Sequence, residues 1–209
     1  MIKIIAHRGM WLTPEEKNTF VAFERALQHG FGIETDFRDR DGQLVISHDP
    51  AKNDPMLAND FFNLCERYPD AGPHAINVKS DGLQALLQQT LQHWSDNRYF
   101  VFDMSVPDTL GYLRLGLNTF TRVSEYEAHQ NFGGKTSGVW LDAFHDQWYD
   151  GQLVCDLSIP KQSVAIVSPE LHGRSHHFLW SMLKSLYTSE MSLMLCTDLP
   201  LEAQRYFHE

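Results

Sequence analysis

Short apolar runs alternate with helical stretches along most of the chain. Eight of these runs predict strands, because each is brief, apolar and rich in β-branched or aromatic residues. They cover residues 2–6, 32–37, 74–78, 99–103, 119–123, 138–141, 163–167 and 192–196. Residues 43–47 predict a short extra strand, which would pair with the second strand through the Asp41-Gly42 turn.

Helical patterns lie between the predicted strands. The clearest covers residues 18–29, where apolar side chains recur at helical spacing and Gly30 is a stop signal. Ser105-Val106-Pro107-Asp108 is a strong start signal for another helix. Further helices are predicted at residues 82–94, about 178–188 and 201–207.

Eight strands that alternate with helices indicate a parallel α/β sheet, and eight is the number that closes a barrel. The sequence therefore predicts a compact (β/α)8 barrel, or TIM barrel, with a short extra hairpin after the second strand. No repeat, low-complexity tract or Pro/Gly-rich linker divides the chain, so we expect residues 1–209 to form a single domain. An open doubly wound sheet is the alternative.

Polar and ionisable residues follow the apolar runs at the carboxyl end of each predicted strand. In a barrel these ends meet on one face, where the loops build the active site. The residues are His7-Arg8-Gly9, Glu34-Thr35-Asp36, His48-Asp49, Asn77-Val78-Lys79, Asp103, Glu125, Asp142, Glu170 and Asp198.

Glu34 and Asp36 are two residues apart on one strand, so their side chains point the same way. Two such carboxylates repel each other unless a cation neutralises them. Oxygen ligands of this kind suit a hard divalent cation, Mg²⁺ or Ca²⁺. The alternative is a solvated strand edge with ion pairs to Arg38 or Arg40.

His7 and His48 each follow an apolar run directly, and a histidine pair suits proton transfer near neutral pH. Arg8 could grip a phosphate through its planar guanidinium, and Lys79 could hold one as a point charge. Each residue has a structural alternative: the chain has 11 histidines, and either cation could simply pair with a neighbouring carboxylate.

Composition narrows the function further. The net charge is -10, which argues against nucleic-acid binding, although a bound metal would still permit a phosphate-bearing substrate. No apolar run is long enough to span a bilayer or to form a signal-peptide core. The three cysteines lie far apart, which suits a reducing cytoplasm, so we expect a cytoplasmic protein.

The motifs together resemble those of the glycerophosphodiester phosphodiesterase family, which is similar in fold to the phosphatidylinositol-phospholipase-like barrels. The densest match covers residues 1 to about 50: AHRG, then Asn18-Thr19, Glu34-Thr35-Asp36 and His48-Asp49. Later matches are Asn77-Val78-Lys79 and Thr197-Asp198-Leu199-Pro200. The resemblance implies a metal-dependent phosphodiesterase barrel. It implies that His7 and His48 are the acid/base pair, that Glu34 and Asp36 bind metal, and that Arg8 and Lys79 hold phosphate.

The chain departs from the family pattern twice. The family has the sequence PENT at the start of the first helix, whereas this chain has two extra residues there, Pro14-Glu15-Glu16-Lys17-Asn18-Thr19. The glutamate of the family pattern therefore maps to either Glu15 or Glu16. Asn77 replaces a metal-binding glutamate; its amide oxygen can still ligate Mg²⁺ or Ca²⁺ but brings no charge. Asp103, at the end of the next strand, is our candidate for the missing carboxylate. The alternative for Asp103 is a residue near the cap of the following helix, although Ser105 fits that cap better.

The leading hypothesis is metal-dependent hydrolysis of a small-molecule phosphodiester. Segments 124–127, 142–145, 168–174 and 197–198 would supply a polar rim that suits a hydroxyl-rich leaving group such as glycerol or a sugar. One rival is a barrel that lost catalysis and binds a phosphorylated ligand as a regulatory protein, which Asn77 favours. A second is a sugar isomerase or hydrolase, which has no use for Arg8 and Lys79. The oligomeric state is not predicted.

Overall fold

The structure is a computed structural model that describes residues 1–52, 54–130, 132–158 and 162–209. Its internal contacts divide the chain into two compact units. We call Ile5–Thr119 the N-terminal unit, and Met1–Ile4 with Phe120–Glu209 the C-terminal unit. The single domain expected from the sequence stays a prediction.

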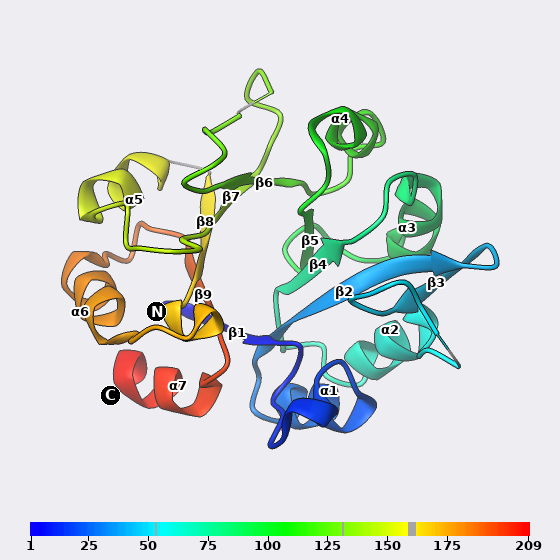
Figure 1. Ribbon diagram of the computed structural model, residues 1–209, viewed down its shortest axis with the longest axis horizontal. Coiled ribbons are helices and arrows are strands. Elements are labelled where there is room, and N and C mark those ends of the chain that lie inside the picture. Colours follow the sequence, from blue (N-terminus) through cyan, green and yellow to red (C-terminus); the bar gives the residue numbers. More distant parts are fainter. Residues whose placement is uncertain (53, 131, 159–161) are drawn as a thin grey trace. The chain divides into compact units, whose positions relative to one another are not determined.

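The N-terminal unit holds a parallel sheet with the strand order β5-β4-β2-β1. Strand β3 lies off this path and pairs antiparallel with β2. The strands are β1 (Lys3–His7), β2 (Gly32–Arg40), β3 (Gln43–Ile46), β4 (His74–Val78) and β5 (Tyr99–Phe102). The helices are the 3-10 turn η1 (Pro14–Glu16), α1 (Phe20–Gln28), α2 (Ala58–Glu66), α3 (Gln84–Leu91) and α4 (Val106–Arg114). Figure 1 shows the β2–β3 hairpin between α2 and α3.

The C-terminal unit contains four more parallel strands in the order β9-β8-β7-β6. They are β6 (Phe120–Val123), β7 (Gly138–Leu141), β8 (Ser163–Val167) and β9 (Leu193–Thr197). The helices are α5 (Gly151–Leu157), the 3-10 turn η2 (Pro169–His172), α6 (His177–Leu186) and α7 (Pro200–His208). Figure 1 draws them from green to red.

The eight parallel strands and the helices between them are those of a (β/α)8 barrel, as the sequence predicts, and the extra strand β3 is also confirmed. Three strands match their predicted bounds: β4, β7 and β8. Strand β2 extends beyond residue 37 to Arg40, because its outer end pairs with β3. The cap predicted at Ser105 forms, since its hydroxyl accepts the Asp108 N–H at 3.4 Å.

Helix α2 has no counterpart among the sequence predictions. It begins after Leu57, whose side chain makes no capping bond, so the usual polar start signal is missing. The helix is held instead by its aromatic face: Phe61 packs edge-on against Phe23 of α1 at 5.1 Å and against Phe37 of β2 at 5.9 Å between ring centroids. Burying each such side chain contributes about 1.5–3 kcal/mol. This packing fixes β2, which carries the two central carboxylates of the candidate site.

A buried histidine completes the core of the N-terminal unit. His74 is fully buried, and its Nδ1 accepts the Ile33 N–H at 3.2 Å. Burial lowers the pKa of His74 to about 3, and the nearby Arg98 charge adds to the shift. His74 is therefore neutral in the folded protein and serves as a backbone acceptor between β2 and β4.

Candidate functional site

Seven of the residues singled out from the sequence come together in the N-terminal unit. Strand pairing places His7 beside Glu34 and Asp36 beside Asn77. Lys79 follows β4, and Asp103 follows β5. Parallel strands bring these positions to the same end of the sheet, as the sequence analysis expects.

The turn after β1 is shaped by residues in left-handed backbone conformations. Arg8 has a φ of 55°, Gly9 of 86° and Asn18 of 59°. A Cβ on Gly9 would lie 2.8 Å from the backbone of Ala22, so only glycine fits against α1. The chain returns so that the Asn18 N–H donates to the Arg8 carbonyl at 3.0 Å. Non-glycine residues with positive φ are costly and concentrate at functional sites.

Asp36 is the centre of the charge network. Its carboxylate is fully buried and accepts the Asn18 side-chain N–H at 2.8 Å. The Arg8 Nε lies 3.1 Å from one oxygen, and the Lys79 Nζ lies 3.7 Å from the other. One buried carboxylate therefore faces two cations, which offset the cost of burying its charge.

Lys79 also contacts a second carboxylate. Its Nζ donates to the Asp103 Oδ2 at 2.9 Å. Asp103 has a φ of 75°, so its backbone also adopts the left-handed conformation. The ammonium group thus bridges Asp36 and Asp103, and Asp103 lies at the site rather than at the cap of α4.

The negative charge of Glu34 is poorly compensated by its surroundings. Its carboxyl group is buried, accepts the Asn77 side-chain N–H at 3.0 Å, and lies 3.9 Å from the His7 Nε2. Burial raises the pKa of Glu34, and the negative charge of Asp36 raises it further. A positive charge placed beside Glu34 would favour its ionised form.

The site offers a partial fit to a divalent cation. Three buried oxygens have no hydrogen-bond partner: Glu34 Oε2, Asp36 Oδ1 and Asn77 Oδ1. They come from the adjacent strands β2 and β4, and all are the hard ligands that Mg²⁺ and Ca²⁺ prefer. Within the described ranges, however, no group of three or more His, Cys, Asp or Glu side chains is arranged to hold a metal. The fit rests on the amide oxygen of Asn77 beside two carboxylates.

His48 lies close to this network through its backbone, because the N–H of the preceding Ser47 donates to the Asp36 carbonyl at 2.9 Å. It follows β3, its side chain is 49% exposed, and its Nδ1 lies 3.0 Å from Asp49 Oδ1. Across the part of the chain that the structure describes, no hydrogen bond or ion pair connects its imidazole with the other predicted site residues. The structure therefore brings the His7 side chain to the carboxylates and the His48 backbone next to Asp36 at the base of the β2–β3 hairpin, while the His48 imidazole pairs with Asp49.

Asn18 belongs to the Asn18-Thr19 motif, to which the sequence assigns no role, and the structure places its side chain against Asp36. It donates to Asp36 and accepts the Thr35 hydroxyl at 2.8 Å, so it fixes the orientation of the central carboxylate. The sequence signal for Asn18 is the residue type at this turn, because asparagine tolerates the left-handed conformation that the turn requires. The nearby Glu16 has a different use, since it bonds the Arg25 guanidinium at 2.9 Å and the Leu12 N–H at 2.8 Å.

Comparisons with known proteins agree on the fold. No protein-family model matches the sequence, and no curated protein is significantly similar to it. A glycerophosphodiester phosphodiesterase from Parabacteroides distasonis matches with a TM-score of 0.73 and 17% identity, over 99% of this chain and 97% of that one. An Agrobacterium tumefaciens glycerophosphodiester phosphodiesterase matches with a TM-score of 0.69 and 19% identity over 100% of both chains.

A Ca²⁺-dependent phosphatidylinositol-specific phospholipase C from Streptomyces antibioticus is more distant, with a TM-score of 0.59 and 11% identity over 99% of this chain and 96% of that one. At these identities the likeness concerns the fold. The chain has the barrel fold of the glycerophosphodiester phosphodiesterases, the same family that its motifs resemble.

Proposed function

We propose that the chain is a phosphoric diester hydrolase that acts on a glycerophosphodiester-like substrate with a polar alcohol or sugar leaving group. One observation carries the proposal: a single network contains two cations, Arg8 and Lys79, beside buried acid oxygens that have no hydrogen-bond partner. The motifs of the first fifty residues and the fold of the matched phosphodiesterases support it.

Arg8 and Lys79 are the proposed phosphate-binding pair. Both side chains are partly exposed, whereas the Asp36 carboxylate between them is fully buried. Asp36 therefore orients the two cations from the protein side and leaves part of each facing solvent. Their N–H groups would bind the phosphoryl oxygens and stabilise the negative charge that develops in the transition state.

His7 and His48 are the proposed acid/base pair. One imidazole accepts a proton from the attacking hydroxyl group, which belongs to water or to the substrate beside the phosphate. As the new P–O bond forms and the ester bond breaks, the other imidazole donates a proton to the leaving alcohol. A Glu34 carboxyl oxygen lies 3.9 Å from the His7 Nε2, so Glu34 is the acidic group beside this imidazole.

Glu34, Asp36, Asn77 and Asp103 are the proposed ligands of a divalent cation, Mg²⁺ or Ca²⁺. When bound, such an ion would neutralise charge on the phosphoryl oxygens. Asp103 would restore the charge that Asn77 lacks, and cation binding by Asp103 competes with its ion pair to Lys79. An Asp103→Ala variant should bind Mg²⁺ and Ca²⁺ more weakly in calorimetric titration; unchanged affinity would rule Asp103 out as a ligand.

The decisive experiment measures hydrolysis of bis(4-nitrophenyl) phosphate with and without a chelator. We expect the chelator to abolish turnover and added Mg²⁺ or Ca²⁺ to restore it. His7→Ala and His48→Ala should each lower the rate by about 10²–10⁴-fold. His29→Ala, on the exposed end of α1, is the matched control. A hydrolysis rate that is unchanged both by the chelator and by the His7 substitution would contradict the proposal.

A second candidate function is phosphodiester binding without catalysis. Lys79 bridges Asp36 and Asp103, where an external cation would otherwise balance the charge, and Asn77 removes one anionic ligand. A protein of this kind would bind glycerophosphocholine in calorimetry, depend on Arg8 and Lys79, and show no turnover with any divalent cation. Metal-dependent turnover would exclude it.

The proposed setting is the cytoplasm, where the substrate is a small molecule. The cysteines Cys65, Cys155 and Cys196 are all free thiols, which is consistent with a reducing compartment. None of the helices in the described segments is both long and apolar enough to cross a bilayer.

A further inference from the structure

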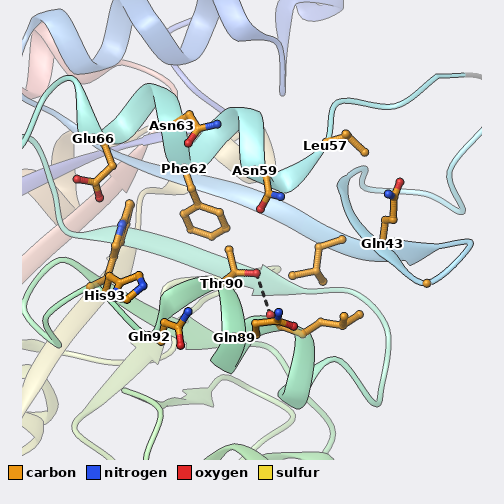
Figure 2. A pocket seen from close by; sticks show the side chains of 14 residues that line it. Gln43, Leu57, Asn59, Phe62, Asn63, Glu66, Gln89, Thr90, Gln92 and His93 are labelled. Atoms are coloured by element: carbon orange, nitrogen blue, oxygen red, sulfur yellow. Dashed lines mark hydrogen bonds between the residues drawn. The ribbon is translucent and has the colours of Figure 1, made fainter.

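A cavity lies in the N-terminal unit, and its lining residues are separate from those of the charged network. It has a volume of about 620 Å³, which is within the range of small-molecule sites. Its walls are the β2–β3 turn, α2, α3 and the segment that follows α3 (Figure 2). None of the proposed catalytic, phosphate-binding or metal-binding residues lines it.

The cavity is rich in carboxamide side chains. Five amides line it: Gln43, Asn59, Asn63, Gln89 and Gln92. Asn59 and Asn63 are four residues apart on α2, so both point from one helical face. Gln89 and Gln92 are three residues apart and approach from the opposite wall, as Figure 2 shows. Two helices therefore present amide groups to the same space.

These amides differ from the other glutamines of α3. Gln84 bonds Asp108, and Gln88 donates to the Leu115 carbonyl at 3.2 Å, so both side chains tie α3 to α4. Over the described residues, the structure records no hydrogen bond from the side chain of any of the five cavity amides to the protein. Their donors and acceptors are open to a ligand.

Aromatic surface lines the same cavity. Phe62 is almost fully buried, and its ring packs edge-on against Trp94 at 5.1 Å between centroids. The Arg98 guanidinium covers one part of the Trp94 ring at 4.3 Å from its centroid. The cavity therefore combines rigid apolar rings with surrounding amides, the mixture that small-molecule sites use for affinity and orientation.

The cavity carries little net charge. Glu66 is the one carboxylate among its described lining residues, and Arg98 pairs with it at 2.9 Å. No Lys or Arg is among those lining residues, so an anionic phosphate would find no permanent cation there. An amide both donates and accepts hydrogen bonds, and so does each hydroxyl group of a sugar.

We propose that this cavity is a binding site for an uncharged saccharide of one or two rings. The amides on α2 and α3 would bond its hydroxyl groups, and the C–H face of the sugar ring would pack against the aromatic surface of Phe62 and Trp94. The site does not depend on the proposed hydrolysis. It gives the chain a means to associate with glycan.

The experiment is a titration of the ¹⁵N-labelled protein with glucose, maltose, cellobiose and N,N′-diacetylchitobiose, followed through side-chain amide resonances. At least one sugar should shift the Asn63 and Gln89 resonances with a dissociation constant of about 1 mM or tighter. The Gln84 and Gln88 resonances should stay in place, because those amides bond other residues. Inorganic phosphate is the negative probe.

Substitutions at two exposed positions of the cavity then test whether its amides bind the sugar. Asn63→Ala and Gln89→Ala should each weaken binding about threefold to tenfold, as expected for the loss of one hydrogen-bonding group. Gln88→Ala, on the same helix but outside the cavity, should leave the affinity unchanged. The proposal is overturned if no sugar shifts the cavity amides at about 10 mM, ten times a 1 mM dissociation constant. It is also overturned if phosphate shifts them equally, or if Gln88→Ala weakens binding as much as the cavity variants.

Discussion

Carboxylates follow the strands of both units, but their oxygens are used differently. In the C-terminal unit, Glu170 accepts hydrogen bonds from the hydroxyls of Thr197 and Ser168 and from the Asp198 N–H. Asp142 accepts the Ala143 N–H at 2.8 Å, and the His172 Nε2 lies 2.8 Å from the same oxygen. In the N-terminal unit, buried oxygens of both Glu34 and Asp36 lack hydrogen-bond partners.

The difference separates structural from functional polar groups. A carboxylate whose oxygens bond nearby backbone and hydroxyl groups holds loops in place, because removing it leaves several donors unpaired. A buried carboxylate with an unpartnered oxygen costs stability, and proteins keep such groups where a ligand or reaction uses them. By this reasoning we expect the proposed reactive centre in the N-terminal unit, and we expect Glu170 and Asp142 to shape the loops of the C-terminal unit.

Glu125 follows the same structural pattern. Burial works against its charge, but backbone N–H groups outweigh that effect and lower the pKa of Glu125. Two of these donors are the N–H groups of His145 at 2.9 Å and Phe144 at 3.1 Å. The carboxylate thus joins the loop after β6 to the loop after β7.

In the comparison of the two units, the largest expected effect comes from removing a cation of the network. Lys79→Met should lower kcat/KM for bis(4-nitrophenyl) phosphate by about 10²–10³-fold, as loss of one charge-stabilising group typically does. Lys184→Met is the matched control, because the recorded contacts of the Lys184 ammonium among the described residues are to the carbonyl and ring of Tyr206 on α7. An equal loss of kcat/KM in the two variants would contradict the proposed functional difference between the two units.

Stability should respond in the opposite order. Glu170→Gln should lower the free energy of unfolding by about 1–3 kcal/mol. The NH₂ group of the new glutamine would face the O–H and N–H groups that now donate hydrogen bonds to the Glu170 carboxylate. Glu34→Gln should leave it unchanged or raise it by about 1 kcal/mol or more, because it removes a buried charge that its surroundings compensate poorly. Urea unfolding measures both values. A Glu34→Gln variant that loses as much stability as Glu170→Gln would make Glu34 a structural residue.

A smaller effect should appear in the pH dependence of stability. Because the pKa of His74 falls from 6.5 to about 3 on folding, its contribution is complete above pH 6.5 and is lost as the pH falls toward 3. The expected slope is up to about 1.4 kcal/mol per pH unit. The raised pKa of Glu34 contributes in the opposite sense above pH 4.5, so the wild type alone does not isolate His74.

The measurement therefore compares the wild type with His74→Asn. Between pH 6.5 and 4.5, the difference in unfolding free energy between the two proteins should shrink as the pH falls. Glu125 should not affect the comparison between pH 6.5 and 4.5. Its pKa is lowered from 4.5, so its contribution to the unfolding free energy is lost only at lower pH. A difference that stays constant would mean that His74 is protonated in the folded protein.

The sequence predicts most of the fold because its strands are apolar runs that periodicity detects. Strands β4, β7 and β8 fall within their predicted bounds, and the Asp41-Gly42 turn correctly indicates the β2–β3 hairpin. Helix α2 could not be found in this way, because its start has no polar cap and its stability comes from aromatic rings distant in sequence, such as Phe23 and Phe37.

The site was predictable where it depends on strand ends and not where it depends on turns. Parallel strands bring Glu34, Asp36 and Asn77 together whatever the loops do. The bridge formed by Lys79 and the left-handed turn at Asn18 depend on loop conformation, which no local pattern specifies. For the same reason the pairing of the His48 imidazole with Asp49 was not foreseen, and the role of His48 as half of an acid/base pair stays a prediction.

The most direct test compares two aspartates of matched chemistry. Asp36→Asn and Asp142→Asn each neutralise a buried carboxylate, the first on β2 in the N-terminal unit and the second directly after β7 in the C-terminal unit. Measured at equal folded fraction, kcat/KM for bis(4-nitrophenyl) phosphate should fall about 10²-fold or more in Asp36→Asn. It should stay within about threefold of wild type in Asp142→Asn, a change of less than 1 kcal/mol in the barrier. A loss confined to Asp142→Asn, or equal losses in both, would contradict the assignment of the reactive centre to the N-terminal unit.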